Sequence, residues 1–382
     1  MGAPHLERDD RALPVLVWTR MRVMASTYHR VRGRPRAWRS AGRPLRATLA
    51  VLATLALGAA PAGASTLVIE GAGDGHGVGM SQDGALGYAQ HGWSAAQILA
   101  HYYTGTTLGQ APASFVVKVL VGSKVERVPL ERYVRGVVSA EMPSSWPLAA
   151  LEAQAIASRS YALTTDAGGT RFDVYSDTRS QMYLGTAAET ASTNAAVAAT
   201  AGQIVLYQGK PVTTYYFASS GGMTENIENS FLGAEPEPWL KGVPDSYETK
   251  ASDWKLSMSF ATAAARLHGL FKGSFRGIEV LKRGVSPRIV AAEVLGSRGD
   301  TPVSGPELAG RLGLDSAWAY FSVKSGASVR REPDASGQTA FTPPAPESPP
   351  PTAPAPTTAP QGGAQAPATA AASSATGGVQ AG

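Results

Sequence analysis

The sequence predicts an α+β fold, in which helices and antiparallel strands mix in one or two subdomains. Three observations lead to this prediction. Residues 65–328 contain apolar runs of both helical and strand period, these runs do not alternate as regular βαβ units, and the chain has no Cys to support a disulfide scaffold. We expect residues 65–328 to form the folded part, preceded by a leader in residues 1–64 and followed by a tail in residues 329–382.

The leader has the layout of a secretory signal or an N-terminal anchor. Seven arginines and no acidic residue lie between Arg30 and Arg46, followed by the uncharged run Ala47–Ala60 and small residues up to Ala64. The run is shorter than the roughly 20 apolar residues of a membrane span. We therefore expect a secreted, wall-associated or membrane-associated protein, outside the cytoplasm, with no stable membrane contact beyond the leader.

The tail is predicted to be disordered. Eleven of the 27 prolines lie in residues 333–382, among Ala, Thr, Ser, Gly and Gln, with almost no large apolar side chain. Such a stretch buries too little apolar surface to offset its ordering entropy.

Composition excludes several classes of function. The net charge of +5 arises in the leader, which holds 11 Arg and three acidic residues, so the remainder is slightly acidic and a nucleic-acid partner is not expected. Without Cys there is no thiolate zinc site and no cysteine nucleophile. His76, His91 and His101 lack the H-E-x-x-H spacing, so a zinc hydrolase built from them is only an alternative, and we expect no metal or other cofactor.

Helices and strands are expected in a definite order. A strand at 66–70 enters a glycine-rich run at 71–79, and helices at 81–90 and 94–103, a strand at 115–121 and helices at 129–141 and 147–165 follow. Pro129 and Pro147 suit helix starts, and the residue before Pro143 should end the first of these helices. Further along we expect a helix at 187–201, a hairpin of 204–206 with 212–217, a helix at 259–270, strands at 277–281 and 288–295, a helix at 305–312 and a strand at 320–323.

Glu141 is the strongest candidate for a catalytic residue. It lies on an apolar stripe of helix 129–141, whose members at helical spacing are Val134, Val137, Val138 and Glu141. Burial there would disfavour the charged form and raise the pKa, which suits a general acid at neutral pH. Position alone leaves open a partly buried Glu tied to an arginine. Glu131, four residues before Arg135, is explained as a surface ion pair.

Other segments offer groups that could bind a ligand. Gln154, Ser158 and Tyr161 share one stripe of helix 147–165 and Arg159 lies on the next, which fits either a groove or an ordinary amphipathic helix. His76 lies among glycines that let the backbone come close to a ligand.

Hydroxyl and backbone N–H groups are also concentrated at Ser219-Ser220-Gly221-Gly222. A serine hydrolase is not indicated, because no G-x-S-x-G elbow is present.

Three long motifs stand out: GHGVGMSQDGA at 75–85 with HYYTGT at 101–106, LERYVRGVVSAEMPSSW at 130–146, and LEAQAIASRSYAL at 151–163. They resemble the SpoIID/LytB family of bacterial cell-wall proteins. Weaker agreement continues at Ser176-Asp177, Gln181-Met182-Tyr183, 219–222 and 312–314, so the resemblance covers residues 65–324.

The resemblance implies a lytic transglycosylase that cuts peptidoglycan glycan strands in a cleft, in sporulation or other wall remodelling. Glu141 would act as catalytic acid and base and form 1,6-anhydroMurNAc, and no cofactor is needed because the substrate's own hydroxyl replaces a second carboxylate. The implied substrate-binding residues are Arg159, Tyr161, Gln154, His76, Ser81, Gln82, Gln181, Ser219 and Ser220. The implied partners are glycan strands and a cell-wall amidase. The alternative function is a non-catalytic, peptidoglycan-binding enhancer of such an amidase.

The order of the motifs departs from the family. GHGVGMSQ precedes the glutamate region here, whereas in the family it follows that region near the C-terminus. A circular permutation would explain the order, provided that the ends of the domain lie together. We therefore predict that residues near Thr66 and near Val323 are neighbours in adjacent strands. The cysteine zinc site of some relatives has no ligands in this chain.

Overall fold

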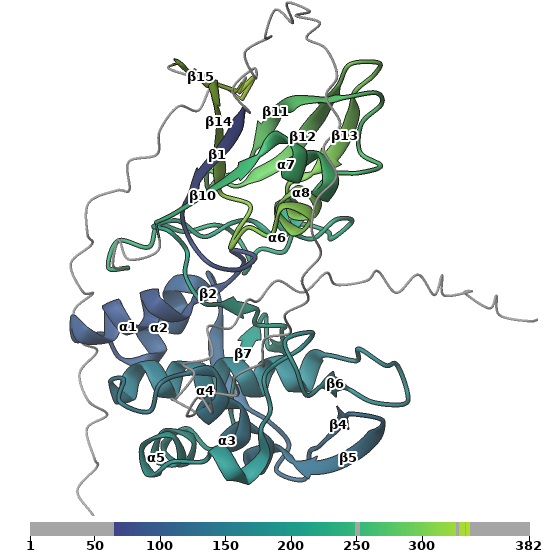
Figure 1. Cartoon of the computed structure of the whole chain (residues 1–382). Helices are drawn as coiled ribbons and strands as arrows, with labels where there is room; N and C mark the ends of the chain where they lie inside the picture. The colour runs from purple at the N-terminus through teal and green to yellow at the C-terminus, as the bar shows by residue number, and fades with distance from the viewer. Residues whose placement is uncertain (1–64, 249–252, 326–327, 333, 337–382) are drawn as a thin grey trace, which may run out of the picture. The chain divides into compact units, whose positions relative to one another are not determined.

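The computed structural model describes residues 65–248, 253–325, 328–332 and 334–336, so the expected leader and nearly all of the expected tail lie outside the described residues. Helices and mainly antiparallel sheets are mixed, which confirms the α+β prediction (Figure 1). In the part of the chain that is described, no helix has the length and apolar character needed to span a membrane.

The first hydrophobic core surrounds α4 (Leu148–Thr164). The helices that pack against it are α1 (Gln82–Gln90), α2 (Ala95–Tyr102), α3 (Leu130–Glu141) and α5 (Ala191–Ala199). Val134, Val137 and Val138 of α3 are fully buried in this core, as their spacing predicts. The apolar stripe of α3 therefore fixes which way the end of that helix faces.

Three small sheets border this core. They consist of β4 (Val116–Val121) between β5 (Lys124–Pro129) and β6 (Val174–Tyr175), of β7 (Gln203–Tyr207) between β3 (Thr107–Gln110) and β8 (Lys210–Pro211), and of β2 (Met80–Ser81) paired in parallel with β9 (Tyr216–Phe217). The short helices η1 (Gly185–Ala188) and α6 (Ile227–Ser230) lie in the connecting segments. The β2–β9 pair brings the glycine-rich segment beside Tyr216.

A second core is built from both ends of the folded part. Its strands are β1 (Thr66–Gly71) between β10 (Trp254–Ser259) and β14 (Ala319–Ser325), with β15 (Ser328–Arg331) beyond, and β12 (Ile289–Gly296) between β11 (Phe275–Arg283) and β13 (Thr301–Ser304). Helices α7 (Phe260–Arg266) and α8 (Gly305–Leu312) complete it.

The two ends of the folded part are neighbours, as predicted. In the antiparallel pair of β1 and β14, Thr66 faces Lys324 and Leu67 faces Val323 (Figure 1). The strand that begins the described chain is thus paired along its whole length with one near its end.

Local signals placed several helix ends correctly. Pro129 and Pro147 occupy the N-cap positions of α3 and α4. Met142 has extended backbone angles (φ −126°, ψ 142°), because the following Pro143 disfavours the helical region, and α3 therefore ends at Glu141.

Three expected elements were wrong in extent. The helix expected at 187–201 begins only at Ala191, because Thr190 forms a capping box, and residues 185–188 form a 3₁₀ turn. Residues 212–217 do not form one long strand that pairs with 204–206. The strand that pairs with the end of β7 is Lys210–Pro211 (β8), and Tyr216–Phe217 (β9) pairs with β2. The helix expected at 259–270 ends at Arg266 and follows the unpredicted strand β10.

Candidate active site

Glu141 is the last residue of α3, where the chain turns at Met142 and Pro143. The residue as a whole is half-buried. Oε1 accepts the backbone N–H of Met182 at 2.7 Å and lies 3.2 Å from the Tyr216 hydroxyl, and Oε2 lies 3.4 Å from the amide nitrogen of Gln82. The carboxyl group is therefore held by three segments that are distant from one another in the sequence.

Burial raises the pKa of Glu141 above its usual range, and the donors from Met182, Gln82 and Tyr216 offset part of this rise. Among the described residues, no Lys or Arg forms an ion pair with Glu141. The alternative of a Glu tied to an arginine is therefore wrong for Glu141. A carboxyl in this setting keeps its proton to a higher pH than an exposed Glu and still finds donors for its ionised form.

The Tyr216 hydroxyl lies between two acceptors. It is 2.8 Å from Oε1 of Gln181 and 3.2 Å from Oε1 of Glu141, and it has one proton to donate. When Glu141 is protonated, Tyr216 can donate to Gln181. When Glu141 is ionised, the same proton can turn to the carboxylate and stabilise it.

Buried amides fix the groups around Glu141. Gln82 donates to Oε1 of Gln154 at 3.3 Å, and Gln154 donates to the Ser158 hydroxyl at 2.9 Å. Gln181 donates to the Tyr133 hydroxyl at 3.2 Å, and both Gln154 and Gln181 are fully buried. Gln82, Gln154 and Gln181 thus lie around the carboxyl, but Gln154 and Gln181 bond protein groups inside the core, and the expected binding of substrate by the three glutamines stays a prediction.

Arg159 does not reach this group. Its fully buried guanidinium is bidentate with Glu131, at 2.8 and 2.9 Å, and also donates to the carbonyl of Gln203 at 2.9 Å. Because its donors are engaged inside the protein, the expected contact of Arg159 with a glycan or with Glu141 is not what the structure shows. The surface pair expected between Glu131 and Arg135 is also wrong, since Arg135 pairs with Glu189 at 3.3 Å.

His76 supports the strand that carries Tyr216. Its ring packs against Tyr215, Phe217 and Phe231, and its Nδ1 accepts the N–H of Val78 at 3.1 Å. Burial, and then Arg288, lower the pKa of His76 to about 3, while a bond from the ring to the backbone of Tyr216 opposes this shift. The imidazole is therefore neutral at physiological pH. It contacts aromatic side chains and backbone of its own surroundings, and not Glu141.

The neighbouring glycines serve packing. Gly77 has φ +86°, and a Cβ there would lie 2.5 Å from Nε of the buried Arg288.

Ser81, Ser219 and Ser220 belong to a separate polar group. Ser219 donates to Glu248, and the Ser220 hydroxyl lies within hydrogen-bond distance of both Glu248 and Asp245, 2.8 Å from Oδ2 of Asp245, with one proton to donate to either. Ser81 caps α1 through the N–H of Gly84, at 3.0 Å, and hydrogen-bonds Asp245. These three serines contact the carboxyl groups of Asp245 and Glu248 and do not contact Glu141.

Tyr161 lies beside the site without bonding Glu141. Its hydroxyl interacts with the side chains of Ser180 and Thr165, and its ring meets Tyr215 edge-on, with centroids 5.8 Å apart.

The zinc alternative finds no support, because no three His, Asp or Glu side chains within the described residues are grouped so that they could hold a metal ion. The expected glycan cleft stays a prediction.

Sequence reasoning missed Tyr216, the Met182 amide and the pair of Asp245 with Glu248. Met182 and Tyr216 lie 41 and 75 residues from Glu141, and a backbone N–H has no sequence signature at all. The one available signal for Met182 was the short resemblance at Gln181-Met182-Tyr183.

Comparison with known proteins shows what this chain is similar to. Residues 122–207, which include Glu141 and Met182, match the family model for SpoIID, the stage II sporulation protein. Stage II sporulation protein D of Bacillus subtilis (strain 168) is 30% identical over 230 residues, covering 55% of this chain and 65% of that protein. The protein of the same name from Bacillus amyloliquefaciens is 30% identical over 232 residues, with the same coverage. An amidase enhancer of Bacillus subtilis (strain 168) is 39% identical over 111 residues, covering 29% of this chain and 14% of that protein. The chain thus spans a little less than two thirds of the two sporulation proteins.

Proposed function

Because this chain belongs to the SpoIID/LytB family, we propose that it is an extracytoplasmic cell-wall protein that cleaves peptidoglycan glycan strands as a lytic transglycosylase. The observation that supports this most is Glu141, a half-buried residue whose carboxyl pKa is raised by burial and which has no cationic partner among the described residues. Such a group can donate a proton to a leaving oxygen and then accept one.

The proposed reaction uses one carboxyl group twice. Glu141 gives its proton to the oxygen that links N-acetylmuramic acid to N-acetylglucosamine, and the C1–O bond breaks. The C6 hydroxyl of the muramic acid ring attacks C1 and releases its proton to the ionised Glu141. The products are a strand ending in 1,6-anhydroMurNAc and a strand with a free N-acetylglucosamine end, and no water is consumed. Glycosidases need a second carboxylate to activate a water molecule or to act as the nucleophile, and this reaction requires neither.

The surrounding donors suit this cycle. The Met182 N–H, at 2.7 Å, and the Tyr216 hydroxyl, at 3.2 Å, stabilise the carboxylate that exists after the first proton transfer. Oε2 has only the 3.4 Å contact from Gln82, so it is the oxygen better suited to exchange a proton with substrate. Tyr216 and Gln82 would thus act as positioning residues for Glu141.

The test is digestion of purified glycan strands, with mass spectrometry of the products. Wild type should produce anhydromuramyl ends, and Glu141→Gln should lower their rate of formation by roughly 10²–10⁴-fold. Glu152→Gln is the matched control, because Glu152 is a partly buried carboxyl of α4 that hydrogen-bonds none of the residues around Glu141, and it should behave as wild type. A Glu141→Gln protein as active as wild type would show that another group is the acid.

The similarity to an amidase enhancer favours one other function, a wall-binding protein that stimulates an amidase without cutting glycan. In that case wild type forms no anhydro ends, and both wild type and Glu141→Gln raise the rate at which a cell-wall amidase releases peptides.

A further inference from the structure

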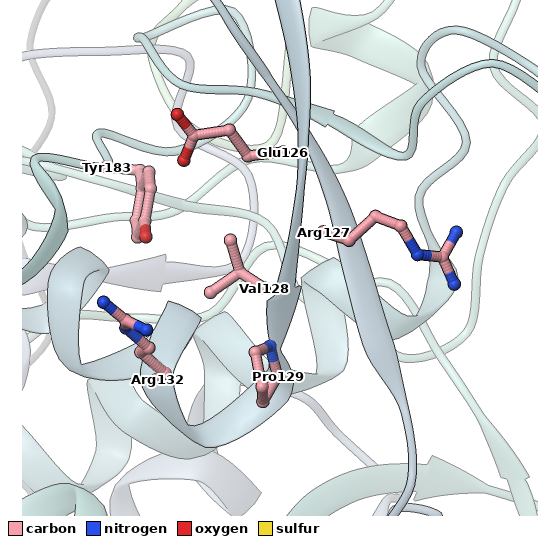
Figure 2. Close-up of a pocket in the computed structure, with 6 residues that line it drawn as sticks. All are labelled: Glu126, Arg127, Val128, Pro129, Arg132 and Tyr183. Atoms are coloured by element: carbon pink, nitrogen blue, oxygen red, sulfur yellow. The ribbon is translucent and has the colours of Figure 1, made fainter.

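A cavity of about 140 Å³ lies at the opposite end of α3 from Glu141. It is lined by Glu126, Arg127, Val128, Pro129, Arg132 and Tyr183 (Figure 2). From Arg132 to Glu141 the helix rises by roughly 13 Å, at 1.5 Å per residue. The cavity is therefore separate from the site described above, but both lie along one helix. Its volume is well below the roughly 300–1,000 Å³ of pockets that enclose drug-sized ligands, so it suits one small ring.

The ring of Tyr183 is held in place before any ligand binds. It stacks on Tyr133, with centroids 5.1 Å apart and an interplanar angle of 28°. Its backbone N–H donates to the carbonyl of Ser176 at 3.1 Å. A Cβ at Gly136 would lie 2.6 Å from the ring, so the glycine of α3 leaves the space that Tyr183 occupies. A fixed aromatic face loses little entropy when a ligand stacks on it.

Opposite charges border this face. Figure 2 shows the Tyr183 ring between the carboxylate of Glu126 and the guanidinium of Arg132, with Val128 beside it. Neither Glu126 nor Arg132 forms an ion pair with another described residue, and both side chains are exposed. The Arg127 side chain extends away from Tyr183, to the other side of β5 (Figure 2), so the charges that border the ring are one negative and one positive. These two charges cancel, and the pair favours a neutral ligand over an ion. A carboxylate accepts and a guanidinium donates several hydrogen bonds, which matches the vicinal hydroxyls of a sugar, and the tyrosine face matches its C–H surface.

The cavity is also linked to Glu141 through the chain. Tyr183 follows Met182, whose N–H bonds Oε1 of Glu141, and the Tyr133 hydroxyl under the ring accepts from Gln181. The segment 181–183 thus lies between the cavity and the carboxyl.

We propose that this cavity is a remote subsite that holds one neutral sugar ring of a glycan strand whose reacting bond lies at Glu141. The assignment rests on the proposed function for its substrate class. It predicts that strands long enough to span the two ends of α3 bind more tightly than short fragments.

The test measures binding of neutral N-acetylglucosamine oligomers, from two to eight units, to the full chain carrying Glu141→Gln, by calorimetry. Adding Arg132→Gln should weaken binding of the longest oligomers roughly tenfold, as expected for one lost hydrogen bond to a charged group, and leave the shortest unchanged. Arg276→Gln is the matched control, since it makes the same charge change at an exposed arginine of β11 that does not line the cavity. Equal effects of Arg132→Gln and Arg276→Gln, or no effect of either, would overturn the subsite.

Glu126→Gln separates neutral from anionic ligands. A neutral sugar that bonds the carboxylate should bind more weakly after this change, whereas an anionic group should bind more tightly because a like charge has been removed. Tighter binding of glycan by Glu126→Gln would overturn the proposal of a neutral ring.

The binding test of the subsite and the cleavage test of the proposed function can fail separately. If wild type forms anhydro ends and Arg132→Gln does not affect binding, the subsite fails and the proposed function stands. If wild type forms no anhydro ends while long oligomers depend on Arg132, the transglycosylase proposal fails and the binding site stands.

Discussion

The backbone N–H of Met182 donates to Oε1 of Glu141 across 2.7 Å, at the point where α3 ends. This bond and the Tyr216 hydroxyl lie on the same carboxylate oxygen, so both act most strongly on the ionised form of Glu141.

Tyr216→Phe removes the donor that turns between Gln181 and Glu141. For the proposed transglycosylase reaction we expect kcat to fall roughly tenfold to a hundredfold, because the carboxylate formed in that reaction would lose a hydrogen bond and Gln181 would lose its donor. The pKa of Glu141 should rise further, so the loss of activity on the alkaline side should move to higher pH. A pH profile of glycan cleavage measures both effects. Tyr215→Phe is the control, and a Tyr216→Phe enzyme with the wild-type profile would contradict this role.

Glu141→Gln should stabilise the protein at neutral pH. Burial raises the pKa of Glu141, so the folded state binds this proton more tightly than the unfolded state, and stability falls as pH rises from the unfolded pKa through the folded one. A neutral amide removes that loss, and we expect a gain of roughly 0.5–2 kcal/mol, the usual size of a single stabilising substitution. Urea unfolding of wild type and Glu141→Gln at pH 4 and pH 8 measures this difference in the free energy of unfolding. The gain should be present at pH 8 and nearly absent at pH 4.

Glu131→Gln and Arg159→Met should both destabilise the fold without any direct effect on chemistry. The Arg159 side chain is fully buried, and removal of one partner of a buried ion pair costs about 3–5 kcal/mol because the remaining charge is left unpaired. Since the Glu131 side chain is 37% exposed, Arg159→Met should cost less than Glu131→Gln. Thermal unfolding ranks the two. Activity per folded molecule should stay near wild type at a temperature where each variant is folded.

Asp245→Asn should change how stability depends on pH. Burial, and then the neighbouring Glu248, raise the pKa of Asp245 to about 8. The folded state therefore retains a proton that the unfolded state releases above its ordinary pKa near 4, and stability should decline between pH 4 and pH 8. Asp74 and Asp83, whose pKa values burial raises to about 6, add to the same trend. Asp245→Asn should flatten the upper part of this decline in melting temperature measured from pH 5 to pH 8. An unchanged slope would show that Asp245 is ionised in the fold.

The pairing of β1 with β14 allows the motif order to be rearranged. A chain that runs from Ser114 to Lys324, then through a short turn to Thr66 and on to Ala113, keeps this antiparallel pair and opens the protein at an exposed loop. We expect it to fold, with a somewhat lower melting temperature because β15 and the Arg283–Asp334 pair are lost. Circular dichroism and thermal unfolding test this. A chain joined in the same way but opened between Ala155 and Ile156, inside α4, should not fold cooperatively.

Much of the fold could be predicted because its signals are local. Pro129 and Pro143 set the two ends of α3, Pro147 sets the start of α4, and the spacing of Val134, Val137 and Val138 sets which face of α3 is buried. The strand β10 was missed although Trp254–Ser259 alternates apolar and polar side chains, which is the signal of a half-buried strand. The start of α5 was missed because the decisive Thr190 cap lies inside an Ala-rich run that favours helix throughout.

The sequence by itself determined that a carboxyl at position 141 lies on an apolar stripe at a helix end, since a period of 3.6 residues and one proline suffice for that. Only the tertiary structure decided its partners. Gln82, Met182 and Tyr216 come from segments 59, 41 and 75 residues away, and Arg159, which lies on the neighbouring helix, is instead neutralised by Glu131. Hydrogen bonds form between groups that packing brings within about 3 Å, and that proximity depends on how whole elements are arranged rather than on any local pattern.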